Sequence, residues 1–221
     1  MNMLTSSVGK KIMMAVTGVI LVLFIIGHVI GNMTIFVGPD GINAYAVHLR
    51  DLGPLLWLVR LVMLSIFLFH VYLGVSLTLE NKAARPVGYN QKTDLVTGFA
   101  AQTMWVSGLV LLAFVVYHVL HFTLHVGVDN VGGLIDAAGR FDVYTMVVQG
   151  FHKAINTIFY VVAMAFLFLH VSHGFQSFWQ SLGLNNERTQ PKFQIVGKLV
   201  SLVVAAGFVS IPVIAMLILK A

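Results

Sequence analysis

Five long apolar segments constrain the fold of this 221-residue chain more than any other feature. Each is bounded by polar residues or by glycine and proline. Each also reaches the length of about 20 apolar residues that spans the hydrocarbon core of a bilayer. The sequence therefore predicts an all-α integral membrane bundle of five transmembrane helices, with residues 1–221 forming a single domain. The predicted helices cover approximately residues 12–36, 55–79, 99–126, 155–178 and 195–219.

Charged residues are too few to cover a water-soluble globule. Only 10% of the residues are charged and 58% are hydrophobic, whereas soluble domains carry about 25% charged residues. Lipid must therefore cover much of the surface. The net charge of +5 is attributed to basic residues retained on the cytoplasmic side of a membrane. Because no basic stripe alternates with aromatic residues, nucleic acid is not an expected partner.

The lysines and arginines between the apolar segments favour one orientation. With the N-terminus inside, eight basic residues fall in inner segments and five in outer segments, in agreement with the positive-inside rule. The first apolar segment is longer than the roughly 7–15 apolar residues of a signal peptide, so we expect it to remain as a membrane helix. The outer segments 37–54 and 127–150 can each hold a short amphipathic helix.

Histidine is the only abundant metal-ligating residue, because the chain has nine histidines and no cysteine. The lack of cysteine excludes disulfides, thiolate zinc sites, cysteine-ligated iron–sulfur clusters and a thiol nucleophile. Ionisable side chains inside a membrane helix are costly and usually functional. Histidine occurs in the first four apolar segments and not in the fifth, which makes the placement of these side chains the main functional signal.

The depth of the histidines predicts two pairs. At a rise of about 1.5 Å per residue, His28 and His118 lie at a similar outer level, and His70 and His170 share an inner level. Two imidazoles facing each other at one level form the axial ligands of a six-coordinate haem, which suits electron transfer. The sequence thus predicts two haem layers within the bundle. Histidines that only hydrogen-bond neighbouring helices are the alternative interpretation.

Glycines accompany the predicted ligands. Gly27 and Gly31 flank His28, while Gly74 and Gly174 each follow a predicted inner ligand by four residues and share its helix face. Glycine at these positions would let a porphyrin edge approach the backbone. Small residues also mediate helix packing in membranes, so both interpretations stay open.

Further histidines have competing interpretations. His121 and His125 share a face with His118 and are alternative ligands, although they lie farther towards the outside. His173 is one turn from His170 and is a candidate hydrogen-bond partner for a haem propionate or for a neighbouring residue. His152 is expected at the membrane interface.

Short motifs in the first four apolar segments carry a resemblance to a known family: Ser7-x-Gly9-x-Lys11, Gly27-His28 with Gly31-Asn32, His70-x-x-x-Gly74, Tyr117-His118-Val119 and His170-x-Ser172-x-Gly174-x-x-Ser177. In order, spacing and depth, they resemble the dihaem cytochrome b subunit of succinate:quinone oxidoreductases. That subunit is the single-chain, five-helix membrane anchor of succinate dehydrogenases and fumarate reductases. The resemblance covers nearly the whole chain.

The resemblance implies that His28 and His118 ligate a distal haem b, and that His70 and His170 ligate a proximal haem b. It implies a multi-pass oxidoreductase subunit of the inner (cytoplasmic) membrane, with a flavoprotein and an iron–sulfur subunit docked on the cytoplasmic face. The dicarboxylate active site would lie on the flavoprotein. This chain would exchange electrons with a quinone, often menaquinone, and the complex could dimerise.

The family's quinone site is usually near the distal haem. Here the outer segment contains Asn43, His48 and Asp51, which resemble an Asn/His/Asp pattern of some members with a one-residue difference in spacing. A solvated loop with helix-capping side chains is the alternative. Some dihaem members carry a glutamate two residues before the last haem ligand, where this chain has Phe168. A proton route through that glutamate is therefore in doubt.

Two other functions compete with this interpretation. One is a dihaem cytochrome b that serves a hydrogenase or a formate dehydrogenase, which would differ in its partner subunits. The other is a small transporter that uses histidines as a proton or metal path, which predicts no haem absorbance.

Overall fold

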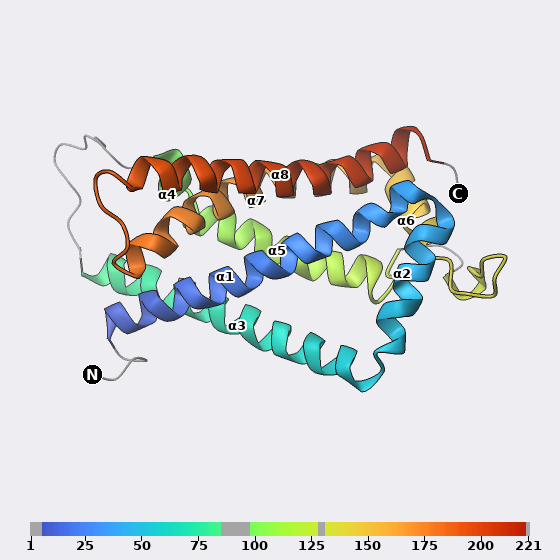
Figure 1. The fold of residues 1–221 in the computed structure, drawn as a ribbon, viewed down its shortest axis with the longest axis horizontal. Helices are drawn as coiled ribbons and strands as arrows, with labels where there is room; N and C mark the ends of the chain where they lie inside the picture. Colours follow the sequence, from blue (N-terminus) through green and yellow to red (C-terminus); the bar gives the residue numbers. More distant parts are fainter. Residues whose placement is uncertain (1–5, 85–97, 128–130, 220–221) are drawn as a thin grey trace.

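Five membrane-spanning helices form the body of the molecule, which the computed structural model describes at residues 6–84, 98–127 and 131–219. All five are long and apolar enough to cross a bilayer. They run side by side, and α1 begins at the end of the bundle opposite to the end at which α8 stops (Figure 1). The described residues contain no strand, so the predicted all-α bundle of five transmembrane helices is confirmed. In chain order the spans are α1 (Ser7–Asn32), α3 (Pro54–Ala83), α5 (Met104–Phe122), α7 (Ala154–Ser181) and α8 (Gln190–Leu217).

The predicted third helix, 99–126, was too long. A break at Thr103 (φ −96°, ψ 8°) separates the short helix α4 (Phe99–Gln102) from α5. At the other end, His125 (φ 58°) and Gly127 (φ 81°) have left-handed backbone conformations. Such conformations cannot continue a right-handed helix, so α5 ends at Phe122.

The first helix begins earlier than predicted, at Ser7 rather than near residue 12. The Ser6 side chain accepts a hydrogen bond from the Gly9 backbone N–H at 3.1 Å, which caps the helix. One turn later, Lys10 is buried against α3, where its ammonium group donates to Ser76 and pairs with Glu80. This ion pair ties α1 to α3 at the end of the bundle where α1 begins, here called the inner end.

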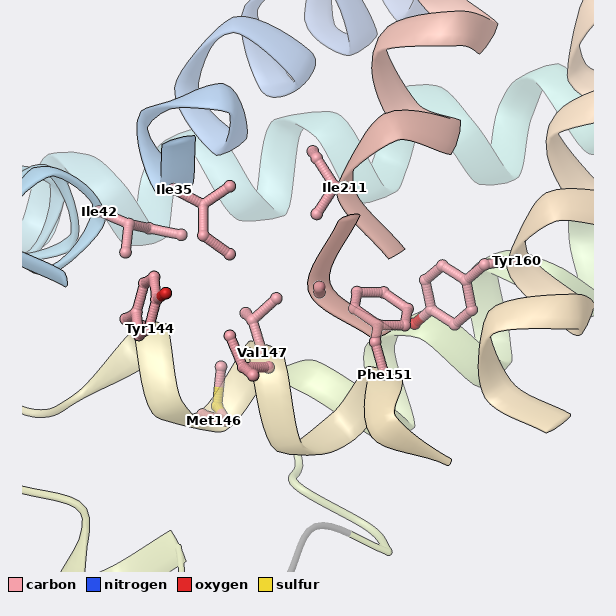
Figure 2. Packing of buried hydrophobic residues seen from close by; sticks show 10 residues of the cluster. Ile35, Ile42, Tyr144, Met146, Val147, Phe151, Tyr160 and Ile211 are labelled. Carbon is pink, nitrogen blue, oxygen red and sulfur yellow. The ribbon is translucent and has the colours of Figure 1, made fainter. Parts of the chain in front are cut away.

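Two short helices, α2 (Pro39–Asp51) and α6 (Val143–His152), lie at the opposite, outer end. They confirm the amphipathic helices expected in the segments 37–54 and 127–150. Their apolar faces meet residues of α7 and α8 in a buried cluster (Figure 2). Packed side chains therefore fill the outer end of the bundle. The cluster comprises Ile35, Ile42, Tyr144, Met146, Val147, Val148, Phe151, Tyr160, Ile211 and Ala215.

The spans differ in how much protein covers them. Seven residues are buried on each of α7 and α8, whereas Leu73 is the one buried residue of α3. The large apolar side chains exposed along α3, such as Leu61 and Leu64, suit contact with lipid. The protein therefore holds α3, which carries His70, through few side chains.

Candidate functional site

Four helices bring four histidines together in two pairs. The rings of His28 (α1) and His118 (α5) have centroids 5.8 Å apart and planes at 85°. The rings of His70 (α3) and His170 (α7) have centroids 6.4 Å apart and planes at 65°. These are called the outer pair and the inner pair. Each pair joins two helices that are far apart in the sequence.

A hydroxyl contacts each ring of the inner pair. Thr17 Oγ1 on α1 lies 2.9 Å from Nδ1 of His70, and Ser107 Oγ on α5 lies 3.1 Å from Nδ1 of His170. Each hydroxyl comes from a helix that carries an outer histidine. The Nδ1 atoms are therefore engaged by the protein, and Nε2 is the nitrogen left to meet a bound group.

The same sequence pattern places both hydroxyls. It consists of a hydroxyl residue, a glycine, a phenylalanine seven positions after the hydroxyl residue, and a histidine eleven positions after it. Eleven residues return a helix to nearly the same face about 16 Å farther along its axis. The hydroxyl thus meets the inner pair while the histidine joins the outer pair. The two copies are Thr17, Gly18, Phe24 and His28 on α1, and Ser107, Gly108, Phe114 and His118 on α5.

The other positions of the pattern also have matching contacts. A Cβ added at Gly18 would lie 3.4 Å from Cε1 of His70, and one at Gly108 would lie 3.6 Å from Cε1 of His170. Phe24 stacks on His28 with ring centroids 5.6 Å apart. Phe114 stacks in the same way on His118, at 5.8 Å. This repeat was not predicted from the sequence, although it is visible when the first and third apolar segments are aligned with each other.

The outer pair has different partners. Tyr160 Oη on α7 lies 3.2 Å from Nδ1 of His118 and 3.2 Å from Nδ1 of His121. On the other ring, Asn32 Nδ2 donates to the backbone oxygen of His28 at 2.8 Å and lies 3.3 Å from Nδ1 and 3.4 Å from Nε2 of the His28 ring. The phenol hydroxyl is thus shared between a predicted ligand and a second histidine.

His121 belongs to a buried polar group rather than to the ring pair. It is 2% exposed, and its Nε2 lies 3.4 Å from Asn156 Nδ2. Asn156 also accepts a hydrogen bond from Tyr117 Oη at 2.8 Å and donates to Gly150 O at 2.7 Å. Among the histidines of α5, His118 is therefore the one that faces His28.

The remaining predicted site residues are dispersed. His173 Nε2 lies 3.0 Å from Ser177 Oγ on its own helix, and His125 lies in the turn after α5. His48 and Asp51 are exposed on α2. The predicted quinone contact Asn43 is fully buried and faces a different set of partners.

The side-chain amide of Asn43 connects α2 to the segment before α6. Its Nδ2 donates to Asp136 Oδ2 at 3.1 Å and to Asp142 Oδ1 at 3.0 Å, while its Oδ1 accepts from the Tyr144 N–H at 3.0 Å. Arg140 pairs with Asp136 and with Asp40 of α2. Burial raises the pKa of Asp136, but hydrogen bonds from Arg140, Asn43 and Ala138 outweigh it and hold that pKa below its usual value.

The histidine pairs match the donor set of a haem. A metal–imidazole bond of about 2 Å, with the ring centre about 1 Å beyond the nitrogen, places two rings on opposite sides of one ion with centres roughly 6 Å apart. The ring separations of 5.8 and 6.4 Å agree with this value. No group of three or more histidine, aspartate or glutamate side chains suited to a metal occurs in the described segments. A haem needs only two axial ligands from the protein.

The glycines divide between the two interpretations given for them. A Cβ at Gly27 or Gly174 would meet nothing within 4 Å. Gly27 is exposed, so the free space there is at the molecular surface, whereas Gly174 is half-buried. At Gly74 a Cβ would lie 3.2 Å from the flexible end of Met14. At Gly31 it would collide with the ring of Tyr45, so this glycine serves the packing of α1 against α2.

No protein-family profile, curated protein or solved structure matches this chain. The geometry of the site and the sequence motifs therefore carry the functional assignment.

Proposed function

We propose that this protein is an electron-carrying membrane cytochrome that holds two b-type haems between its two histidine pairs. The observation that carries the proposal is the meeting of four histidines from α1, α3, α5 and α7 as two opposed ring pairs, with centroids 5.8 and 6.4 Å apart. A pair of fixed imidazoles fills both axial positions of the iron, and this favours electron transfer over oxygen chemistry.

The finer proposal is that the chain is the dihaem anchor subunit of a succinate dehydrogenase or fumarate reductase. Its sequence motifs support this assignment. The chain would carry electrons between an iron–sulfur subunit and a membrane quinone, for which menaquinone is the first candidate. Asn43 is committed to other partners, which leaves the exposed His48 and Asp51 as the candidate quinone contacts of α2.

The residues of this chain would prepare the electron carriers. When bound, each haem supplies a one-electron couple at a closed coordination site. His28 and His118 would hold the outer haem, and His70 and His170 would hold the inner haem. The two levels are separated by eleven residues on α1 and on α5, or about 16 Å along the helices. The stacked Phe24 and Phe114 restrict the orientation of the outer ligands.

The test is the haem content of the purified full-length chain. A reduced-minus-oxidised spectrum with a haem-to-chain ratio near two supports the proposal, and a chain without haem refutes it in favour of the transporter alternative. The matched control is His152→Ala. The side chain of His152 is at the outer end and bonds the Leu219 carbonyl oxygen, so its removal should leave both haems in place.

The partner subunit tests the finer proposal. Purification of the intact complex from detergent-solubilised membranes should recover a flavoprotein together with an iron–sulfur protein, with succinate–quinone activity. Recovery of a hydrogenase or a formate dehydrogenase subunit instead would keep the dihaem cytochrome and replace the assignment to succinate dehydrogenase.

A further inference from the structure

Each hydroxyl at the inner pair has a carbonyl acceptor on its own helix. Thr17 Oγ1 lies 2.9 Å from the Met13 carbonyl oxygen, and Ser107 Oγ lies 2.9 Å from the Met104 carbonyl oxygen. A carbonyl oxygen can only accept a hydrogen bond. The single hydroxyl proton therefore points along the helix, and the oxygen lone pairs are left to accept from the histidine.

This direction selects one tautomer of each inner histidine. A neutral imidazole carries its proton on one nitrogen only, and an acceptor at Nδ1 places that proton on Nδ1. The lone pair is then on Nε2, the nitrogen that a metal needs. The protein thus fixes both inner rings as ligands through residues of its own.

Burial makes these bonds costly to lose. Ser107 is fully buried and Thr17 is 7% exposed, so water does not readily replace either hydroxyl. A glycine follows each of them, and Cε1 of the histidine lies 3.4 or 3.6 Å from its Cβ position, which is van der Waals contact distance. Each inner histidine ring therefore lies against a hydroxyl and the glycine that follows it.

The same arrangement occurs twice, on α1 and on α5, which distinguishes it from a helix hydroxyl that bonds only a backbone carbonyl. Serine and threonine inside helices often bond a carbonyl one turn back without any other role, as Thr78 does to Gly74 O at 2.7 Å. Only a specific placement explains why α1 and α5 both put the hydroxyl eleven residues before an outer histidine and both direct it at Nδ1 of an inner one.

We propose that Thr17 and Ser107 are positioning residues of the inner site, which hold His70 and His170 as Nδ1–H tautomers and lower the reduction potential of the haem bound between them. The second part rests on the proposed dihaem function. An acceptor at Nδ1–H increases the basicity of a ligating imidazole, and a stronger donor favours the oxidised iron. Removal of the acceptors should therefore favour the reduced haem.

The experiment is a redox titration of the purified full-length holoprotein, followed by the haem absorbance. In Thr17→Val and in Ser107→Ala, we expect the reduced-to-oxidised ratio of the inner haem at a fixed potential to rise about three- to tenfold, where tenfold corresponds to about 59 mV for one electron. The double variant should show the two changes added on the logarithmic scale. The outer haem should keep its potential.

Matched controls separate a positioning role from a structural one. Thr78→Val and Ser201→Ala each remove a hydroxyl that bonds only a carbonyl of its own helix. Thr78 bonds the Gly74 carbonyl oxygen and Ser201 the Lys198 carbonyl oxygen, and neither variant should change the reduction potential of either haem. Thr17→Ser restores the acceptor and should restore the wild-type value. If Thr17→Val lowers the occupancy of the inner haem, the potential of the inner haem that is still bound shows whether the change is a rise or a fall.

The outcomes are distinct. A holoprotein with two haems in which Thr17→Val and Ser107→Ala behave like their controls, or shift both haems equally, overturns the positioning role and leaves the proposed function intact. A chain without haem overturns the proposed function together with the effect on potential.

Discussion

The outer histidine pair comes from α1 and α5 and the inner pair from α3 and α7, and the two pairs are supported differently. At the inner pair, each ring meets an aliphatic hydroxyl that is anchored to a backbone carbonyl of its own helix. At the outer pair, His118 meets the phenol of Tyr160, which also contacts His121. The inner partners can only accept from the ring, while the outer partner belongs to a longer polar chain. The difference predicts that the two sites respond separately to substitution.

The largest expected effect is the loss of one haem from one level. His118→Ala should reduce the haem-to-chain ratio from near two to near one and remove the outer haem, and His170→Ala should do the same for the inner haem. Removing one of two axial ligands leaves the iron a single protein bond. Haem stoichiometry and redox titration of each purified variant measure the effect.

His121→Ala tests whether His118 or His121 is the ligand of the outer haem. If His121 were the ligand, its removal would eliminate the outer haem and His118→Ala would leave that haem bound. We expect the reverse, because His118 faces His28 and His121 is bonded into the group around Asn156. A ratio near one in His121→Ala together with a ratio near two in His118→Ala would reverse the ligand assignment.

A smaller effect is expected from Tyr160→Phe, which removes the hydroxyl shared by His118 and His121 while keeping the ring in the outer cluster. Loss of an acceptor at Nδ1 of His118 should raise the midpoint potential of the outer haem by up to about 59 mV, a tenfold change, and leave the inner haem unchanged. Redox titration measures both. Tyr72→Phe, at an exposed position of α3, is the control, and equal shifts of both haems would contradict the separation of the two sites.

The sequence predicted the parts of this comparison that depend on local periodicity. Apolar length gave the five spans, and the rise per residue put His28 level with His118 and His70 level with His170. The supporting residues were harder to predict, because a threonine or serine in an apolar helix has no distinctive signal of its own. Thr17 and Ser107 become visible only when the two copies of the pattern are aligned. Tyr160 has no such repeat, since its role depends on how α5 and α7 pack.

Long-range polar contacts were also beyond the sequence. Asn43 was predicted as a quinone contact from the segment in which it occurs. Its partners Asp136 and Asp142 are more than ninety residues away and are reached only after α2 and α6 have packed. Helix ends were misplaced where caps and left-handed residues, such as Ser6 and His125, decided them.

The outer end also offers a test of stability that leaves the histidines intact. Asn43→Ala should lower the free energy of unfolding by about 1–3 kcal/mol, because it leaves the buried Tyr144 N–H without its acceptor. For a chain of this size, each kcal/mol corresponds to about 2–4 °C in Tm. Thermal unfolding in detergent measures the loss. Both haem potentials should stay at the wild-type values, and a change in the outer potential would show that this network acts on the outer pair.

The smallest expected effect is the pH dependence of that same network. Although burial raises the pKa of Asp142, hydrogen bonds from Thr145 and Asn43 outweigh it, so the folded pKa is lowered, as it is for Asp136. A carboxylate with a lowered folded pKa adds stability above its unfolded pKa of about 3.9, and that stability is lost as the pH falls through the folded value. The Tm of the wild type should therefore fall as the pH drops below about 4. The Tm of Asn43→Ala should fall less over the same interval, because both carboxylates have lost a donor. An identical decrease of Tm in the wild type and in Asn43→Ala would mean that Asn43 does not stabilise the charged carboxylates. The acid sensitivity would then arise elsewhere, for example at the ion pair of Lys10 and Glu80 at the inner end.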